Sequence, residues 1–172
     1  MNNDTWQHIK ILGMNVDGVL TDGNVYCNEK GSELLSFNRY DSFGMHKLMS
    51  KGIHICILSY HTSATADKYL REIGVKDIYF DVKMKINALQ QVAAKYDCGL
   101  VDIAYIGTDE FDLEIFNHIG LPIAVANAQR TVIDSSKYVT TRTGGNGAVR
   151  EVCDLLIEAK LQKEISESYE KE

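Results

Sequence analysis

Short apolar runs alternate with amphipathic segments along most of the chain. The apolar runs predict buried strands over 9–16, 53–58, 77–80, 103–106, 123–126 and 138–141. Between them, apolar residues recur at helical spacing. This spacing predicts helices from Asp41 or Ser42 to Gly52, from Thr62 or Ser63 to Gly74, and over 84–96, 111–119 and 148–163. Because strands alternate with helices, the pattern predicts an α/β fold of Rossmann type, a parallel sheet with helices on both faces.

One segment departs from this alternation. Two short apolar stretches, 25–27 and 33–37, flank a polar turn that contains Gly31, and they predict a β-hairpin within 24–38 whose loop has four or five residues. The chain contains no linker, repeat or low-complexity segment, so we expect one domain over 1–172. The charged segment 164–172 is expected to fray.

Composition narrows the class of protein. The 172 residues are 45% hydrophobic and 24% charged, which is ordinary for a globular domain with a core. The formal net charge of -6 argues against nucleic-acid binding. Without an apolar run of 18 residues or an apolar N-terminus, we expect neither a membrane span nor a signal peptide. The four cysteines form no Cys-x-x-Cys pair, which favours reduced thiols in a cytoplasmic protein.

Polar side chains follow the predicted strands where each strand ends. They are Asn15 and Asp17 after the first strand, Ser59 after the second, Lys85 at the start of a helix, and Thr108, Asp109 and Asp112 after the fourth. Ligands of open α/β sheets bind outside the carboxyl ends of the strands, so we expect these side chains to meet at one edge. Carboxylates with a hydroxyl group and a lysine are suited to Mg²⁺ and a phosphate group.

Several of these stretches together resemble a known family. Residues 15–23 resemble the motif Asp-Val-Asp-Gly-Val-Leu-Thr-Asp-Gly, and residues 144–156, Phe37, Asn38, Asp41 and Gly44 fit further signatures. The resemblance, over roughly 8–157, is to the haloacid dehalogenase (HAD) superfamily and specifically to the 3-deoxy-D-manno-octulosonate 8-phosphate (KDO 8-phosphate) phosphatases. It implies a Mg²⁺-dependent phosphomonoesterase with an HAD-like sheet, a hairpin and no large cap domain.

The resemblance also implies a role for each matching position. The nucleophile position holds Asn15, the general acid–base position holds Asp17, Ser59 matches the phosphate-binding hydroxyl, and Lys85 matches the lysine that steadies the phosphate. The metal-binding positions are Asn15, Asp17, Thr108, Asp109 and Asp112, with Thr108 in place of an aspartate. Tyr60 and His61 stand where the family usually has Gly-Arg.

Two of these departures bear directly on the chemistry. A carboxylate oxygen can attack phosphorus, whereas the neutral amide of Asn15 is a poor nucleophile and offers no negative oxygen to a hard cation. Thr108 removes a second charged ligand. The sequence therefore predicts weak or absent binding of Mg²⁺.

Each candidate also has a purely structural interpretation. Asp17 suits a turn before Gly18, Ser59 a cap or turn, Lys85 a solvated helix face, Asp109 and Asp112 a helix N-terminus, and 144–147 a flexible turn. These alternatives stay open at the level of sequence.

Three functional hypotheses follow. The first is a catalytically impaired homologue that oligomerises or senses a ligand. Vertebrate sialic-acid cytidylyltransferases carry a similar C-terminal domain with degenerate motifs, so a cytidylyltransferase is a candidate partner. The second is an active Mg²⁺-dependent phosphatase of an eight- or nine-carbon keto-sugar acid phosphate, such as KDO 8-phosphate or a nonulosonate 9-phosphate. The third is a sugar-phosphate binder that uses Ser59 and Lys85. The resemblance further implies a homotetramer assembled through the hairpin 24–38.

Overall fold

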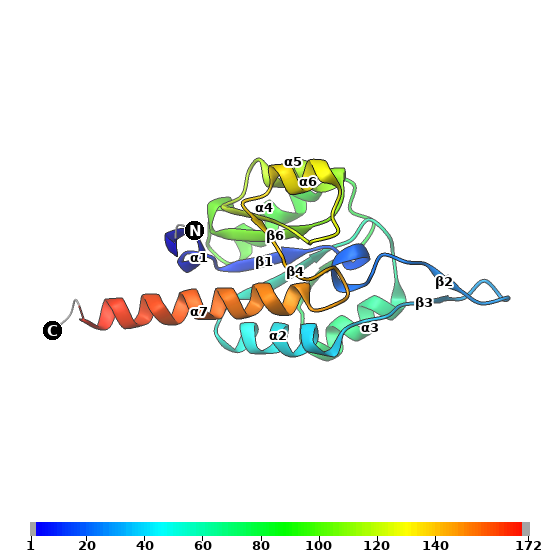
Figure 1. Cartoon of the computed structure of the whole chain (residues 1–172), viewed down its shortest axis with the longest axis horizontal. Helices are drawn as coiled ribbons and strands as arrows, with labels where there is room; N and C mark the ends of the chain where they lie inside the picture. Colours follow the sequence, from blue (N-terminus) through cyan, green and yellow to red (C-terminus); the bar gives the residue numbers. More distant parts are fainter. Residues whose placement is uncertain (1–2, 170–172) are drawn as a thin grey trace.

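The computed structural model describes residues 3–169 and contains one six-stranded parallel sheet (Figure 1). The strand order is β5-β4-β1-β6-β7-β8, and every neighbouring pair is parallel. The strands are β1 (Ile11–Met14), β4 (His54–Leu58), β5 (Asp77–Tyr79), β6 (Ile103–Gly107), β7 (Leu121–Ala124) and β8 (Tyr138–Val139). The predicted parallel α/β sheet is therefore confirmed.

Helices cover both faces of the sheet, as predicted (Figure 1). One face packs against α1 (Asn3–Gln7), α2 (Arg39–Ser50), α3 (Ala64–Ile73) and α7 (Ala148–Tyr169). The other face packs against α4 (Lys85–Lys95), α5 (Leu113–Phe116) and α6 (Arg130–Ser135). Successive strand residues point to opposite faces, so Leu12 and Met14 join the first core while Ile11 joins the second.

Local sequence signals set some helix boundaries and not others. The predicted cap at Ser63 is confirmed, because its side chain accepts a hydrogen bond from Ala66 N at 3.2 Å. Gly74 ends the same helix in the left-handed conformation, with φ 99°. The predicted start of α2 at Asp41 or Ser42 is wrong. Asn38 caps this helix instead, accepting a hydrogen bond from Tyr40 N at 2.8 Å.

Four further segments differ from the prediction. The helix expected over 111–119 is a 3-10 turn, Glu110–Asp112, followed by the short α5. The helices α1 and α6 were not predicted, because each is too short to show a helical period. The expected fraying after residue 163 is not observed up to Tyr169, since α7 continues to that residue. Residues 170–172 of that segment lie outside the described residues.

The predicted hairpin is present and projects from the body beside the carboxyl end of the sheet (Figure 1). Its strands are β2 (Tyr26–Cys27) and β3 (Glu33–Leu34), which pair antiparallel around a five-residue loop. The loop is ordered by Asn28, whose Oδ1 accepts hydrogen bonds from the main-chain N–H groups of Lys30 and Ser32.

Within residues 3–169, no helix combines the length and the apolar character needed to cross a membrane.

Candidate functional site

A pocket of about 160 Å³ lies at the carboxyl ends of β1, β4 and β6. It is lined by Asn15, Asp17, Ser59, Tyr60, His61, Lys85, Thr108, Asp109, Phe111 and Asp112. The structure thus brings together all seven polar residues that the sequence placed at this edge. The parallel sheet brings these residues to one edge, because the carboxyl ends of neighbouring strands meet on one side of the sheet.

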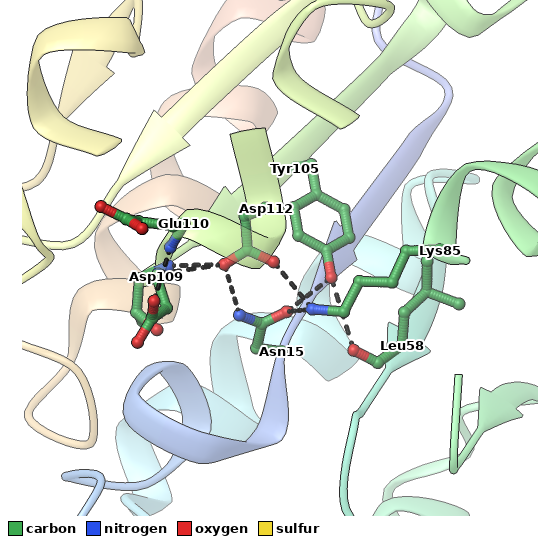
Figure 2. Close-up of polar contacts among 8 residues, drawn as sticks. Asn15, Leu58, Lys85, Tyr105, Asp109, Glu110 and Asp112 are labelled. Carbon is green, nitrogen blue, oxygen red and sulfur yellow. Dashed lines mark hydrogen bonds and ion pairs between the residues drawn. The ribbon is translucent and has the colours of Figure 1, made fainter. Parts of the chain in front are cut away.

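Three of these residues form a buried hydrogen-bonded triangle (Figure 2). Asn15 Nδ2 donates to Asp112 Oδ2 at 2.7 Å, and Lys85 Nζ donates to both Asn15 Oδ1 and Asp112 Oδ1 at 2.7 Å each. Asn15 is 8% exposed, Lys85 5% and Asp112 0%. Lys85 is buried at the first turn of α4, and its ammonium group bonds within the site. The interpretation of Lys85 as a solvated side chain is therefore wrong.

Tyr105, which the sequence analysis did not single out, completes this network. Its hydroxyl group donates to Asn15 Oδ1 at 2.6 Å and lies 3.4 Å from Leu58 O (Figure 2). The residue paired with it on β1 is Gly13. A Cβ atom at Gly13 would lie 2.5 Å from Tyr105 Cδ2, so the glycine creates the space for the ring. A phenol in a buried strand needs a polar partner, and this need is the sequence signal that points to Tyr105.

Asp112 is held in place by its own loop. Its Oδ2 accepts hydrogen bonds from Thr108 N at 2.9 Å and Asp109 N at 3.3 Å. Gly107 permits this loop conformation, because a Cβ atom there would lie 2.8 Å from both Asp112 Cβ and Asp112 Oδ2. Asp109 caps the following turn by accepting from Glu110 N at 2.6 Å. The capping interpretation thus holds for both residues, which form a capping box, and Asp112 belongs to the buried network as well.

The mouth of the pocket carries a second, solvent-exposed polar group. His61 Nδ1 lies 3.1 Å from Asp17 Oδ2, and both side chains are largely exposed. Ser59 is buried, and its hydroxyl group donates to the main-chain oxygen of His61 at 3.0 Å. The turn interpretation of Ser59 therefore matches the observed bond, and the residue also lines the pocket.

An aromatic pair forms one wall of the mouth. The rings of Tyr60 and Phe111 stack with centroids 5.6 Å apart and an interplanar angle of 21°. Both side chains are exposed to solvent, so the pair joins the loop after β4 to the loop after β6 on the outside of the pocket.

Thr108 and the glycine-rich loop 144–147 pack against the turn after β1. A Cβ atom at Gly18, which has φ 72°, would lie 3.2 Å from Thr108 Cγ2, so the threonine methyl group approaches this turn closely. Gly145 N donates to Val19 O at 2.9 Å, and a Cβ atom at Gly144 would lie 1.8 Å from Gly18 O. The run 144–147 is therefore a packed support of the site rather than a free turn.

The electrostatics of the buried network are balanced. Burial, with the nearby Asp112 carboxylate, raises the pKa of Tyr105, so its hydroxyl group stays protonated at neutral pH. Asn15 carries no charge. The single positive charge of Lys85 therefore faces the single negative charge of Asp112 at 2.7 Å.

The sequence and the fold agree with one family. Residues 74–152 match the haloacid dehalogenase-like hydrolases. The KDO 8-phosphate phosphatase KdsC of Yersinia pestis is 34% identical over 153 residues, which cover 89% of this chain and 82% of the relative. KdsC of Escherichia coli K12 is 34% identical over 154 residues, 90% of this chain and 82% of the relative. The chain belongs to the KDO 8-phosphate phosphatase family of HAD hydrolases.

Solved structures of this family share the fold. The enzyme of Moraxella catarrhalis was crystallised in complex with a magnesium ion, a phosphate ion and KDO. It superimposes with a TM-score of 0.89 at 35% identity, covering 97% of this chain and 96% of that one. The resemblance predicted the HAD-like sheet with a small hairpin, and both are confirmed.

The family implies a magnesium ion, and the residues of this chain do not fit one. No group of three or more His, Cys, Asp or Glu side chains gathers at a common point within residues 3–169. Of the predicted metal-binding residues, Asn15 and Asp112 bond to each other, Asp109 caps a turn, and Asp17 faces His61. Mg²⁺ needs oxygen ligands at about 2.1 Å in octahedral geometry, and the free carboxylate oxygens here are dispersed.

Proposed function

We propose that this chain is a catalytically impaired member of the KDO 8-phosphate phosphatase family that has kept a role in assembly or ligand binding. The observation that carries the proposal is the state of the Asn15 side chain. This residue occupies the position that the resemblance gives to the nucleophile, and its amide group both donates and accepts within the buried network.

The chemistry of an amide supports this proposal. Phosphoryl transfer to the enzyme needs an electron-rich oxygen directed at phosphorus. In Asn15, delocalisation of the nitrogen lone pair leaves a neutral oxygen, and that oxygen already accepts hydrogen bonds from Lys85 and Tyr105. It has neither the charge nor the free lone pair that attack on phosphorus requires.

A retained ligand-binding role is supported by the groups that remain. Ser59 and Lys85 line the pocket, and hydroxyl and ammonium groups are donors suited to a phosphate oxygen. We infer that a sugar phosphate is the ligand class, by analogy with the relatives. The Moraxella catarrhalis enzyme was crystallised with both a phosphate ion and KDO.

One observation favours the alternative of an active phosphatase on an eight- or nine-carbon keto-sugar acid phosphate. Asp17, at the general acid–base position of the resemblance, is 48% exposed at the pocket mouth and lies 3.1 Å from His61. A carboxylate in that place is able to exchange a proton with a leaving group. Activity would then need a nucleophile other than Asn15.

The assembly role rests on the hairpin. Val25 is 72% exposed and Leu34 63% exposed on a two-stranded segment that projects from the body (Figure 1). An isolated hairpin is marginally stable in water and offers unpaired strand edges. We infer that hairpins of neighbouring subunits pack together in a homotetramer, which closed symmetry allows. A cytidylyltransferase is the partner class that the resemblance suggests.

Phosphate release is the experiment that decides between impairment and activity. The purified protein, with and without Mg²⁺, is incubated with KDO 8-phosphate and with a nonulosonate 9-phosphate. We expect phosphate release near background. Turnover at an ordinary enzymatic rate, above about 1 per second, would overturn the proposal. Isothermal titration of the same compounds measures ligand binding separately from turnover.

A further inference from the structure

We propose that the site of this chain is built to stay free of a divalent cation, because hydrogen bonds within the buried network already engage the side-chain oxygen of Asn15 and the carboxylate of Asp112. This inference rests on the proposed impairment of catalysis and supplies its structural basis. It concerns the resting protein, so stability and metal titration test it without any measurement of turnover.

The lone pairs of Asn15 are already occupied. A carbonyl oxygen has two lone pairs, and Asn15 Oδ1 accepts from Lys85 Nζ at 2.7 Å and from Tyr105 OH at 2.6 Å. The nitrogen of the amide is a donor and cannot bind a cation. Coordination by Asn15 would therefore require one of these two buried donors to give up its bond to Asn15, which is unfavourable for buried groups.

The Asp112 carboxylate is engaged as well. Each carboxylate oxygen offers about two acceptor sites. Asp112 receives one hydrogen bond on Oδ1, from Lys85, and three on Oδ2, from Asn15 Nδ2, Thr108 N and Asp109 N. Oδ2 is therefore fully engaged, and the lone pair left on Oδ1 lies beside the Lys85 ammonium group. The direct 2.7 Å contact between Asn15 and Asp112 also places a hydrogen atom, rather than an ion, between residue 15 and this carboxylate.

Charge leads to the same conclusion. The buried network holds one ammonium and one carboxylate group, and the adjacent Tyr105 is neutral. A divalent ion entering this network would add two uncompensated positive charges beside Lys85. Such an excess of buried charge is costly, because the protein interior screens charges poorly. The network is therefore complete without a metal.

Thermal unfolding of the wild-type protein in EDTA and in Mg²⁺ tests the inference first. A functional site with Mg²⁺ present at about 100 times its Kd would raise Tm by about 5–10 °C for a chain of this size. We expect a shift below about 1 °C, which is inside the scatter of such a measurement. A Mg²⁺-dependent rise of several degrees would overturn the inference.

The variant Asn15→Asp tests the charge argument. It converts the donor to Asp112 into a second carboxylate 2.7 Å away, so we expect Tm to fall by about 10 °C at pH 8 in EDTA. We expect the deficit to shrink at pH 5, because protonation of one of the two facing carboxyl groups removes their repulsion and returns a hydrogen-bond donor between them.

Two controls separate charge from structure. Asn87→Asp adds the same charge at an exposed position on α4 and should leave Tm nearly unchanged. The exchange Asn15→Asp with Asp112→Asn restores one carboxylate and one amide, so it should recover most of the lost Tm without metal. Equal stability of Asn15→Asp and wild type at pH 8 in EDTA would overturn the inference. So would a failure of the exchange to recover Tm while Asn87→Asp remains stable.

The outcomes also separate this inference from the proposed function. Phosphate turnover in EDTA would overturn the impairment and leave the metal-free site standing. Stabilisation by Mg²⁺ without turnover would overturn the metal-free site and leave the impairment standing.

Discussion

The ring of Tyr105 lies against the main chain of Gly13, its partner on the neighbouring strand, at a position where any side chain on β1 would collide with it. The close approach brings the Tyr105 hydroxyl group to Asn15, which lies two residues after Gly13, directly past the end of β1. The β1–β6 pair is therefore the floor of the site as well as the centre of the sheet.

Gly13→Ala should destabilise the protein. The added Cβ atom would lie 2.5 Å from Tyr105 Cδ2, so the ring must move within a closely packed core. Overpacking of this kind costs about 1–3 kcal/mol, measured by urea unfolding. Gly99→Ala is the matched control, because the nearest atom to its Cβ would be at an ordinary 3.5 Å. Equal stability of the two variants would contradict the packing argument.

Tyr105→Phe should cost about 0.5–1.5 kcal/mol in the free energy of unfolding. The change keeps the ring and removes the hydroxyl group that donates to Asn15 Oδ1. Tyr40→Phe, on the exposed surface of α2, should cost nothing measurable. Chemical denaturation of both variants compares them, and a Tyr105→Phe variant as stable as wild type would show that the bond contributes nothing.

Asp41→Asn should remove one pH-dependent contribution to stability. Burial raises the pKa of the Asp41 carboxyl group, although the main-chain N–H groups of Arg150 and Gly147 act to lower it, and its Oδ2 has no hydrogen-bond partner. A raised pKa contributes stability that is complete below about pH 4 and is lost as pH rises through the folded value.

Urea unfolding of wild type and Asp41→Asn between pH 4 and pH 7 checks this expectation. The variant should gain stability relative to wild type as pH rises, while the exposed change Asp134→Asn should give a difference that does not vary with pH in this way. Parallel pH profiles for Asp41→Asn and wild type would show that this carboxyl group does not titrate differently in the folded state.

Asn15→Asp combined with Thr108→Asp should recover metal binding before it recovers activity. Together the two changes return the charged oxygens that the resemblance assigns to the ion, while Tyr60 and His61 still alter the loop after β4. Either single change should do little for Mg²⁺ affinity, because the two carboxylates would share one ion and act as a coupled pair. Calorimetric titration measures the affinity, and robust phosphatase activity from Asn15→Asp alone would contradict the prediction.

Leu34→Glu should dissociate the proposed tetramer. Leu34 is exposed on the hairpin, and a carboxylate there would be buried without a partner in a hairpin-mediated assembly. Light scattering after size-exclusion chromatography should give the tetramer mass for wild type and a smaller mass for the variant. Lys30→Glu, in the loop between β2 and β3, is the charge control. A monomer mass for wild type at micromolar concentration would remove the tetramer altogether.

The sequence by itself determined the architecture. Apolar runs such as the one around Ile11 and Leu12 predict buried strands, and side chains that alternate between faces require helices on both sides of the sheet. The Ser63 cap and the Gly74 stop are equally local, because each acts on main-chain groups within a few residues. These features follow from short-range chemistry and are readable without a structure.

Only the tertiary structure decided how the site residues are bonded. Asn15 and Asp112 are 97 residues apart and Lys85 lies 70 residues from Asn15, so no periodicity relates them. Tyr105 escaped the sequence analysis because its partner is brought to it by strand pairing with β1. Asp41, expected to begin α2, accepts from Arg150 N of α7 instead. A side chain of one type can cap a helix, face solvent or bond within the core, depending on which residues lie beside it in the folded protein. Packing between residues far apart in the sequence decides which residues those are.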